Sequence, residues 1–270
     1  MKFYKALDSV KLKKYSEVNK NQFAITFYSK SEFKSSELFD KELKKKVSNF
    51  FVDEKRSSLF LSKELTGLKG DFLVLRDFSK DKSEYKKYSW MKGLFANLDK
   101  YAVENAVIYA DTSHLSKDDY FLFDLAKTAE KVSYRYTDTN PNTKKELILK
   151  NVSLAVENAT AAQKRVVELG YNVGSGANTA RNLGDRPANH ATPAYIANAV
   201  KGLAKDIGGF SVEILEEKDM KKLGMGCLLS VSRGSIEPAK LVTMQYKGGK
   251  KGAKPIVLVG KGVTFDTGGI

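Results

Sequence analysis

Short apolar runs alternate with segments of helical periodicity through the first 150 residues, and this alternation limits the possible folds more than any other feature. The order indicates a domain in which α-helices cover a β-sheet. Strands are predicted at residues 23–28, 71–76, 106–110 and 146–149, and amphipathic helices at residues 90–105 and 120–131. The polar, turn-rich stretch at residues 137–145 predicts an exposed loop.

The composition changes near residue 172, where lysine becomes less frequent and glycine and other small residues become more frequent. Before that point, alanine, valine and leucine recur at helical spacing over residues 152–169, and Gly170 suits the end of a helix. We therefore predict three parts: a first α/β domain over residues 1–150, a linker helix over residues 151–171, and a second domain over residues 172–270.

The second domain is also expected to be α/β, because strand and helix patterns alternate in it as well. Thr192 and Pro193 suit the start of a helix, since a threonine oxygen accepts an unpaired amide and proline lacks that amide. The predicted helices cover residues 193–205 and 217–223, and the predicted strands cover residues 210–215, 227–231, 241–246 and 256–259.

The overall composition is typical of a soluble globular protein. Hydrophobic residues make up 42% and charged residues 29% of the 270 positions, which argues against a disordered chain. No run approaches the roughly 20 apolar residues that cross a bilayer, and lysines near the start are unlike a secretory signal. A cytoplasmic protein without membrane contact is expected. The single cysteine, Cys227, excludes an intrachain disulfide and is expected to be buried.

The net charge of +14 raises the question of a nucleic-acid site. Lysines are scattered among aspartate, glutamate and serine through the first 150 residues, and the densest tracts lie at residues 44–46 and 247–251. We interpret these tracts as a helix face and a turn, so a solvated surface is favoured over a dedicated nucleic-acid site. Nucleic-acid binding by residues 1–150 stays open as an alternative function.

The segment KPIVLVGKGVTFDTGGI at the end of the sequence is the strongest candidate for a functional site. Its apolar run at residues 255–259 suits a buried central strand, and Gly260, Lys261 and Gly262 follow directly. In open α/β sheets ligands bind at the carboxyl ends of the strands. Lys261 and Asp266 are therefore expected where a ligand would bind.

Three interpretations of this segment compete on residue chemistry alone. A phosphate-binding loop would use the glycines and Lys261, but the GxxxxGK[ST] order is missing. A glycine-rich turn with a solvated lysine and a capping aspartate is the plainest structural interpretation. A metal site would use an oxygen of Asp266 and the neutral amine of Lys261. A free lysine has a pKa of about 10.4, so it must lose its proton before it can bind a metal ion.

VGKGVTFDTGGI closely resembles the metal-binding segment of the M17 leucyl aminopeptidases, with Thr267 where that family usually has serine. Two further stretches are similar to motifs of the same family and come in the same order. They are ARNLGDRPANHATPAYIA at residues 180–197 and LGMGCLLSVSRGSIEPAKLVTMQYKG at residues 223–248. Asp185, Ser232 and Arg233 depart from the usual pattern, but none of them is an expected metal ligand.

The resemblance implies an N-terminal macro-like α/β domain followed by part of a metallopeptidase domain. It implies two divalent ions, usually zinc, manganese or magnesium, with Asp266 bridging them and Lys261 holding the more exchangeable one. Both residues would also anchor the substrate's free amine. The implied reaction releases an N-terminal amino acid, often leucine, from a peptide, and the implied assembly is a homohexamer.

The resemblance also limits what these 270 residues are expected to do. The family's catalytic lysine, catalytic arginine and remaining carboxylate ligands correspond to positions after Ile270, so no catalytic residue is expected within the chain. Two ligands cannot fill two metal coordination spheres. We therefore expect an incomplete catalytic domain that is inactive alone, and a remnant that only joins an oligomer stays open as a further alternative.

Overall fold

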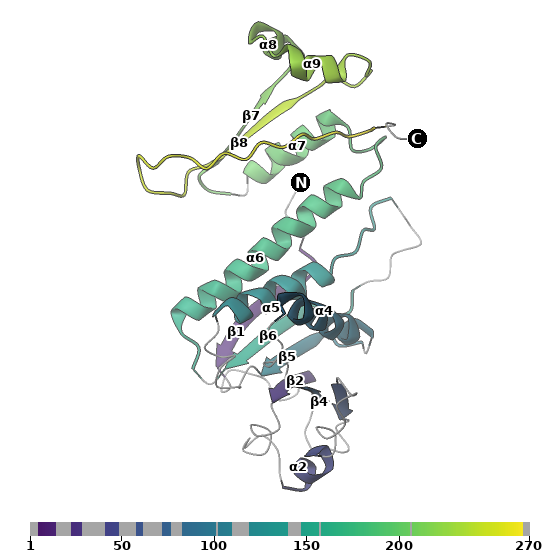
Figure 1. Ribbon diagram of the computed structural model, residues 1–270, viewed down its shortest axis with the longest axis vertical. Helices are drawn as coiled ribbons and strands as arrows, with labels where there is room; N and C mark the ends of the chain where they lie inside the picture. The colour runs from purple at the N-terminus through teal and green to yellow at the C-terminus, as the bar shows by residue number, and fades with distance from the viewer. Residues whose placement is uncertain are drawn as a thin grey trace. The chain divides into compact units, whose positions relative to one another are not determined.

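The computed structural model describes residues 5–14, 23–28, 41–48, 58–61, 72–76, 83–100, 102–109, 119–139, 147–156, 158–205 and 207–266 (Figure 1). These residues divide into two compact units. The N-terminal unit comprises residues 5–178, and the C-terminal unit comprises the described residues from Thr179 onward. Both units combine helices with a sheet, which confirms the predicted α/β class.

The N-terminal unit is built on a six-stranded sheet with the strand order β1-β6-β5-β2-β4-β3. All neighbouring strands are parallel except β3, which pairs antiparallel with β4 at one edge. The strands are β1 (Ser9–Lys14), β2 (Phe23–Tyr28), β3 (Ser58–Leu61), β4 (Phe72–Arg76), β5 (Asn105–Tyr109) and β6 (Asn151–Val156).

Three helices share an apolar core with this sheet, and α5 contacts both α4 and α6. They are α4 (Glu84–Lys100), α5 (Asp119–Val132) and α6 (Ala161–Gly184), and α2 (Lys41–Ser48) is a further helix of the unit. The apolar face of α4, with Met91, Leu94, Phe95 and Leu98, follows the helical spacing and is buried. Removing each such side chain from water stabilises the fold by about 1.5–3 kcal/mol.

Most predicted elements of this unit are confirmed. Strands β2, β4 and β5 and helix α5 lie within one residue of the predictions wherever the residues are described. Helix α4 begins six residues before the predicted start at Trp90 and ends at Lys100, before Ala102 adopts a φ of 57°. Most of the predicted loop at 137–145 lies outside the described residues.

The stretch around β6 contradicts two predictions. Residues 147–150 are irregular, and the strand begins at Asn151, inside the segment predicted to be helical. Val152, Leu154 and Val156 are buried in a strand that pairs with both β1 and β5. A strand enclosed on both faces is apolar throughout, so its sequence pattern is hard to distinguish from that of a buried helix.

Gly170 does not end a helix, as the sequence had suggested, but lies inside α6. A Cβ atom at this position would lie 2.3 Å from the carbonyl oxygen of Phe123 on α5. At Gly174, one turn later, it would lie 2.9 Å from the carbonyl oxygen of Lys127. These two glycines therefore allow the backbones of α5 and α6 to approach closely, and α6 continues to Gly184.

The C-terminal unit contains a two-stranded antiparallel sheet, with Phe210 opposite Tyr246, and three short helices. Its elements after α6 are α7 (Pro193–Ala204), β7 (Phe210–Leu215), α8 (Glu217–Lys222), α9 (Gly226–Ser232) and β8 (Leu241–Tyr246). The predicted start of α7 is confirmed, because the Thr192 hydroxyl accepts a hydrogen bond from the Tyr195 amide at 3.2 Å.

Two predicted strands of this unit are wrong. Residues 227–231 belong to helix α9, where Cys227 is exposed rather than buried. Residues 256–259 form no strand, and the side chains of Ile256, Leu258 and Val259 are each at least 93% exposed. An apolar run becomes a buried strand only when a neighbouring strand pairs with it, and none of the described residues pairs with this one.

No helix in the described part of the chain has both the length and the apolar character needed to span a lipid bilayer.

Candidate functional site

Lys261 and Asp266 lie in the irregular stretch that follows β8, drawn in yellow toward the C-terminus in Figure 1. Both side chains are exposed, and four residues separate them in the sequence. Gly260 and Gly262 flank the lysine, and a Cβ atom at either position would meet nothing within 4 Å. This stretch therefore presents its polar groups to solvent and does not bury them.

The donor types of these two residues suit a metal ion, but their number does not complete a site. A carboxylate oxygen and a neutral amine are both possible ligands, while even a closed zinc site needs about four donors. Among the described residues, no three histidine, cysteine, aspartate or glutamate side chains lie together in a way that could hold an ion. Lys261 and Asp266 are therefore at most part of a donor set.

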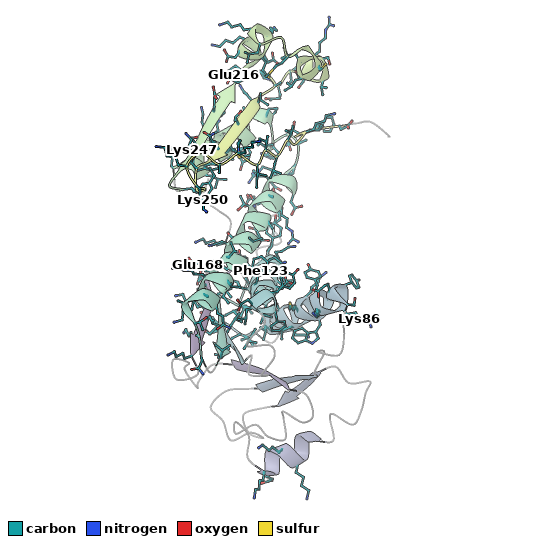
Figure 2. All side chains as sticks on the ribbon, turned by 60° about the vertical axis from the view of Figure 1, so that its left-hand side comes forward. Lys86, Phe123, Glu168, Glu216, Lys247 and Lys250 are labelled. Carbon is teal, nitrogen blue, oxygen red and sulfur yellow. The ribbon has the colours of Figure 1, made fainter. Side chains whose placement is uncertain are left out.

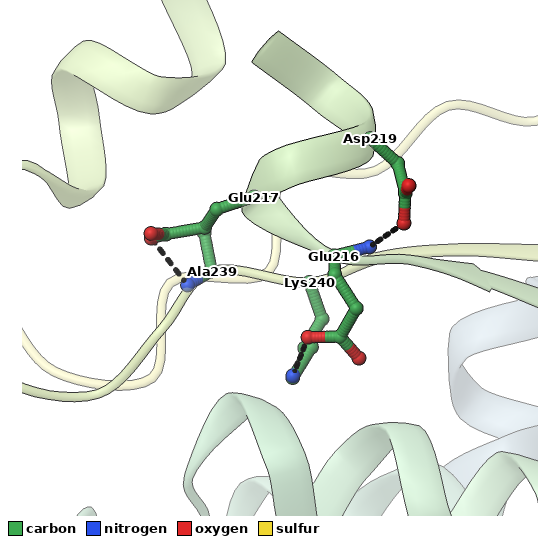
Figure 3. A network of polar contacts seen from close by, with 5 residues as sticks. All are labelled: Glu216, Glu217, Asp219, Ala239 and Lys240. Carbon is green, nitrogen blue, oxygen red and sulfur yellow. Dashed lines mark hydrogen bonds and ion pairs between the residues drawn. The ribbon is translucent and has the colours of Figure 1, made fainter. Parts of the chain in front are cut away.

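A polar network joins the two ends of the connection between β7 and β8, namely the start of α8 and the residues just before β8 (Figure 3). At the start of α8, the Glu216 amide donates to the Asp219 carboxylate at 3.2 Å, and the Asp219 amide donates to the Glu216 carbonyl at 2.9 Å. The Glu217 carboxylate accepts from the Ala239 amide at 3.0 Å, and Lys240 forms an ion pair with Glu216. These contacts hold α8 against the residues that lead into β8.

The N-terminal unit contains a buried carboxylate that the sequence did not reveal. Glu130 on α5 is 0% exposed, and its two oxygens accept the amides of Ala6 at 2.7 Å and Leu7 at 2.9 Å. The Asn178 side chain on α6 donates to the Glu130 carboxylate at 3.2 Å and to its carbonyl at 2.7 Å. The only sequence signal was a glutamate on the apolar face of a predicted helix.

Burial controls the electrostatics of this cluster. Desolvation raises the pKa of Glu130, while the amides of Ala6 and Leu7, the Asn178 side chain and the charge of Lys5 partly oppose the rise. The Tyr171 hydroxyl donates to the Leu7 carbonyl at 2.7 Å, and burial, with the nearby carboxylates, raises the pKa of Tyr171 to about 12. The cluster thus attaches the chain before β1 to helices α5 and α6.

The sequence matches known proteins most clearly in its second half. The pattern described as the cytosol aminopeptidase family, catalytic domain, matches residues 178–270. A probable cytosol aminopeptidase of Thioalkalivibrio sulfidiphilus is 60% identical over 95 residues, which cover 35% of this chain and 19% of that protein. Another, from Aromatoleum aromaticum, is 35% identical over 228 residues, which cover 81% of this chain and 45% of that protein.

The fold is similar to that of a solved structure of a mutant tomato leucine aminopeptidase, with a TM-score of 0.75 at 21% sequence identity. That alignment covers 96% of this chain and 55% of the tomato chain. The chain spans less than half the length of the curated relatives it matches. From the matched pattern and the sequence relatives together, we conclude that this chain belongs to the cytosol aminopeptidase family, M17.

Proposed function

We propose that the protein acts as a metal-dependent aminopeptidase that releases N-terminal amino acids, leucine among them, from peptides. The main support is the segment VGKGVTFDTGGI, which lies within the residues matching the catalytic domain of the family. A cytoplasmic location and assembly into a homohexamer belong to the same proposal, as does the assignment of residues 1–150 as a macro-like domain. Peptides are the proposed partners.

Within this proposal, Asp266 and Lys261 are two of the ligands of a pair of divalent ions of zinc, manganese or magnesium. When bound, such a pair activates a water molecule and polarises the scissile carbonyl. Asp266 supplies a carboxylate oxygen, and a lysine such as Lys261 supplies a nitrogen only as the uncharged amine. Metal binding at this segment is therefore expected to release a proton and to strengthen as pH rises.

We further propose that the 270-residue chain has no aminopeptidase activity of its own. Its two candidate ligands leave most coordination positions of two ions unfilled. The direct measurement is hydrolysis of leucine p-nitroanilide by the purified chain with added manganese or zinc. Metal-dependent turnover by this chain would contradict the proposal.

A chimaera tests the two ligands in a complete catalytic domain. Residues 1–270 of this chain replace the matching part of the Aromatoleum aromaticum relative, and leucine release is measured. Loss of an outer contact to a metal ligand costs about 10–100-fold, so Lys261→Ala or Asp266→Ala is expected to lower kcat/KM by more than about 100-fold. Lys254→Ala, an exposed lysine of the same stretch, is the matched control and is expected to have little effect.

Two outcomes would count against this function. An inactive chimaera that folds and binds zinc or manganese as the relative does would show that these residues do not support the chemistry. An active chimaera that tolerates both substitutions would remove Lys261 and Asp266 from the metal site and leave the aminopeptidase assignment in place.

A further inference from the structure

A strongly basic loop follows β8. Residues 247–254, with the sequence KGGKKGAK, contain four lysines, and all four side chains are exposed; we call this segment the lysine loop. From residue 238 to residue 265 the sequence has six lysines and neither aspartate nor glutamate. Figure 2 shows Lys247 and Lys250 together at this turn. Elsewhere in the sequence lysines are interspersed with acidic residues, so positive charge is least compensated here.

The lysine loop has a defined base and a defined turn. The Lys247 amide donates to the Gly209 carbonyl at 2.8 Å, which attaches the start of the loop to the residue before β7. The Ala253 amide donates to the Lys250 carbonyl at 3.1 Å, and Gly252 has a φ of 82°, a conformation that favours glycine. Lys250 and Lys251 therefore lie in a turn whose first end is attached to the residue before β7.

An exposed aromatic ring lies beside these lysines. Tyr246, the last residue of β8, is 67% exposed. Its ring lies over Gly248, where an added Cβ atom would be 2.3 Å from ring atom Cε1. On the other side, a Cβ atom at Gly209 would be 3.9 Å from ring atom Cε2. The two glycines leave the ring room to lie next to the loop with most of its surface open to solvent.

We propose that the lysine loop binds the phosphate backbone of single-stranded nucleic acid, with Tyr246 stacking on a base. Non-specific binding of single strands combines positive charges that follow the backbone with aromatic rings on which bases stack. The ammonium group of lysine is a point charge on a flexible side chain, and it can donate hydrogen bonds to phosphate oxygens from many directions. The glycines of the lysine loop have no side chain, so the nucleic acid can approach the protein backbone there. Residues 248–253 contain no large apolar side chain, which disfavours insertion into a membrane.

The first test measures binding of the full chain to a fluorescein-labelled oligothymidine of about 15 nucleotides, a length that spans the site sizes of small single-strand-binding folds. Fluorescence anisotropy reports the affinity at several salt concentrations. If four lysines each neutralise one phosphate, the salt slope is about −2.8, which weakens binding about 50-fold between roughly 50 and 200 mM salt. No measurable binding at the lowest salt concentration would overturn the proposal.

Matched variants locate the site. Lys247→Gln, Lys250→Gln, Lys251→Gln and Lys254→Gln together remove the loop's charge at exposed positions, and the salt slope is expected to fall close to zero. The control carries the same four-charge change at exposed lysines of the N-terminal unit, namely Lys11→Gln, Lys86→Gln, Lys92→Gln and Lys164→Gln. The control is expected to bind like the wild type. Equal losses in both variants would show that net charge, not the loop, attracts the oligonucleotide.

Substitutions of Tyr246 test the contribution of base stacking separately from that of the lysine charges. Stacking of one base is worth about 1–3 kcal/mol, so Tyr246→Ala is expected to weaken binding roughly 5- to 150-fold, while Tyr246→Phe keeps the ring and the affinity. A duplex of the same sequence is expected to bind without dependence on this ring. If Tyr246→Ala binds as tightly as the wild type, the stacking half of the proposal is wrong. Loop-dependent binding to phosphatidylserine vesicles without oligonucleotide binding would assign the loop to lipid phosphates instead.

Discussion

Glu130 is enclosed by protein and still serves as the acceptor for two backbone amides of a distant segment. The carboxylate accepts the amides of Ala6 and Leu7 at 2.7 and 2.9 Å, and the Tyr171 hydroxyl donates to the Leu7 carbonyl at 2.7 Å. Burial of an apolar residue at position 130 would cost less desolvation free energy, but the amides of Ala6 and Leu7 would then lack an acceptor. The polar cluster thus sets the position of the chain that enters β1.

The pKa of Glu130 gives a prediction about stability and pH. Burial raises this pKa above its ordinary value of 4.5, so the folded protein keeps a proton that the unfolded chain releases. Stability from this group is present below the unfolded pKa and is lost as pH rises toward the folded pKa. The difference in unfolding free energy between the wild type and Glu130→Gln is therefore expected to change with pH in this window.

The measurement is urea unfolding at a series of pH values, in which the fluorescence of Trp90 monitors the fraction of unfolded protein. This is the single tryptophan of the chain, and it packs against the core of the N-terminal unit. Groups that do not interact with Glu130 contribute equally to both proteins and cancel in the difference. If the wild type and Glu130→Gln show the same pH dependence, Glu130 does not titrate differently on folding.

Among the elements, the contact between α5 and α6 depends most closely on particular residues. Glycine usually weakens a helix interior by about 0.5–1 kcal/mol relative to alanine. Gly170 and Gly174 are nevertheless placed inside α6, where any side chain would meet the backbone of α5. A glycine in a sequence can mark a helix end or a close helix contact, and only the position of the neighbouring helix distinguishes the two.

Gly170→Ala and Gly176→Ala form a matched pair on the same helix. At Gly170 the added carbon would lie 2.3 Å from a backbone oxygen of α5, so the helices must separate and stability is expected to fall by about 1–3 kcal/mol. At Gly176 nothing lies within 4 Å, so the helix preference of alanine is expected to raise stability by up to about 1 kcal/mol. Trp90 fluorescence during urea unfolding gives both values, and equal effects of the two substitutions would contradict the close contact.

At the scale of the whole chain, sequence patterns predicted elements where local periodicity and burial agree. The strand β5 and the helix α5 are such cases. The patterns were misleading at β6, at residues 227–231 and at residues 256–259, because an apolar run does not say whether a neighbouring strand will enclose it. Lys261 and Asp266 could be selected from one segment, but a metal site requires donors from several segments, whose arrangement local sequence does not determine.

The exposed apolar run at residues 256–259 has a consequence for the behaviour of the chain in solution. An extended apolar segment without a paired strand can associate with the same segment of another copy. The purified chain is therefore expected to self-associate as its concentration rises, as measured by sedimentation velocity. Ile256→Lys with Leu258→Lys should reduce this association. Thr243→Lys with Gln245→Lys adds the same charge at exposed positions of β8, and an equal reduction there would point to general repulsion instead.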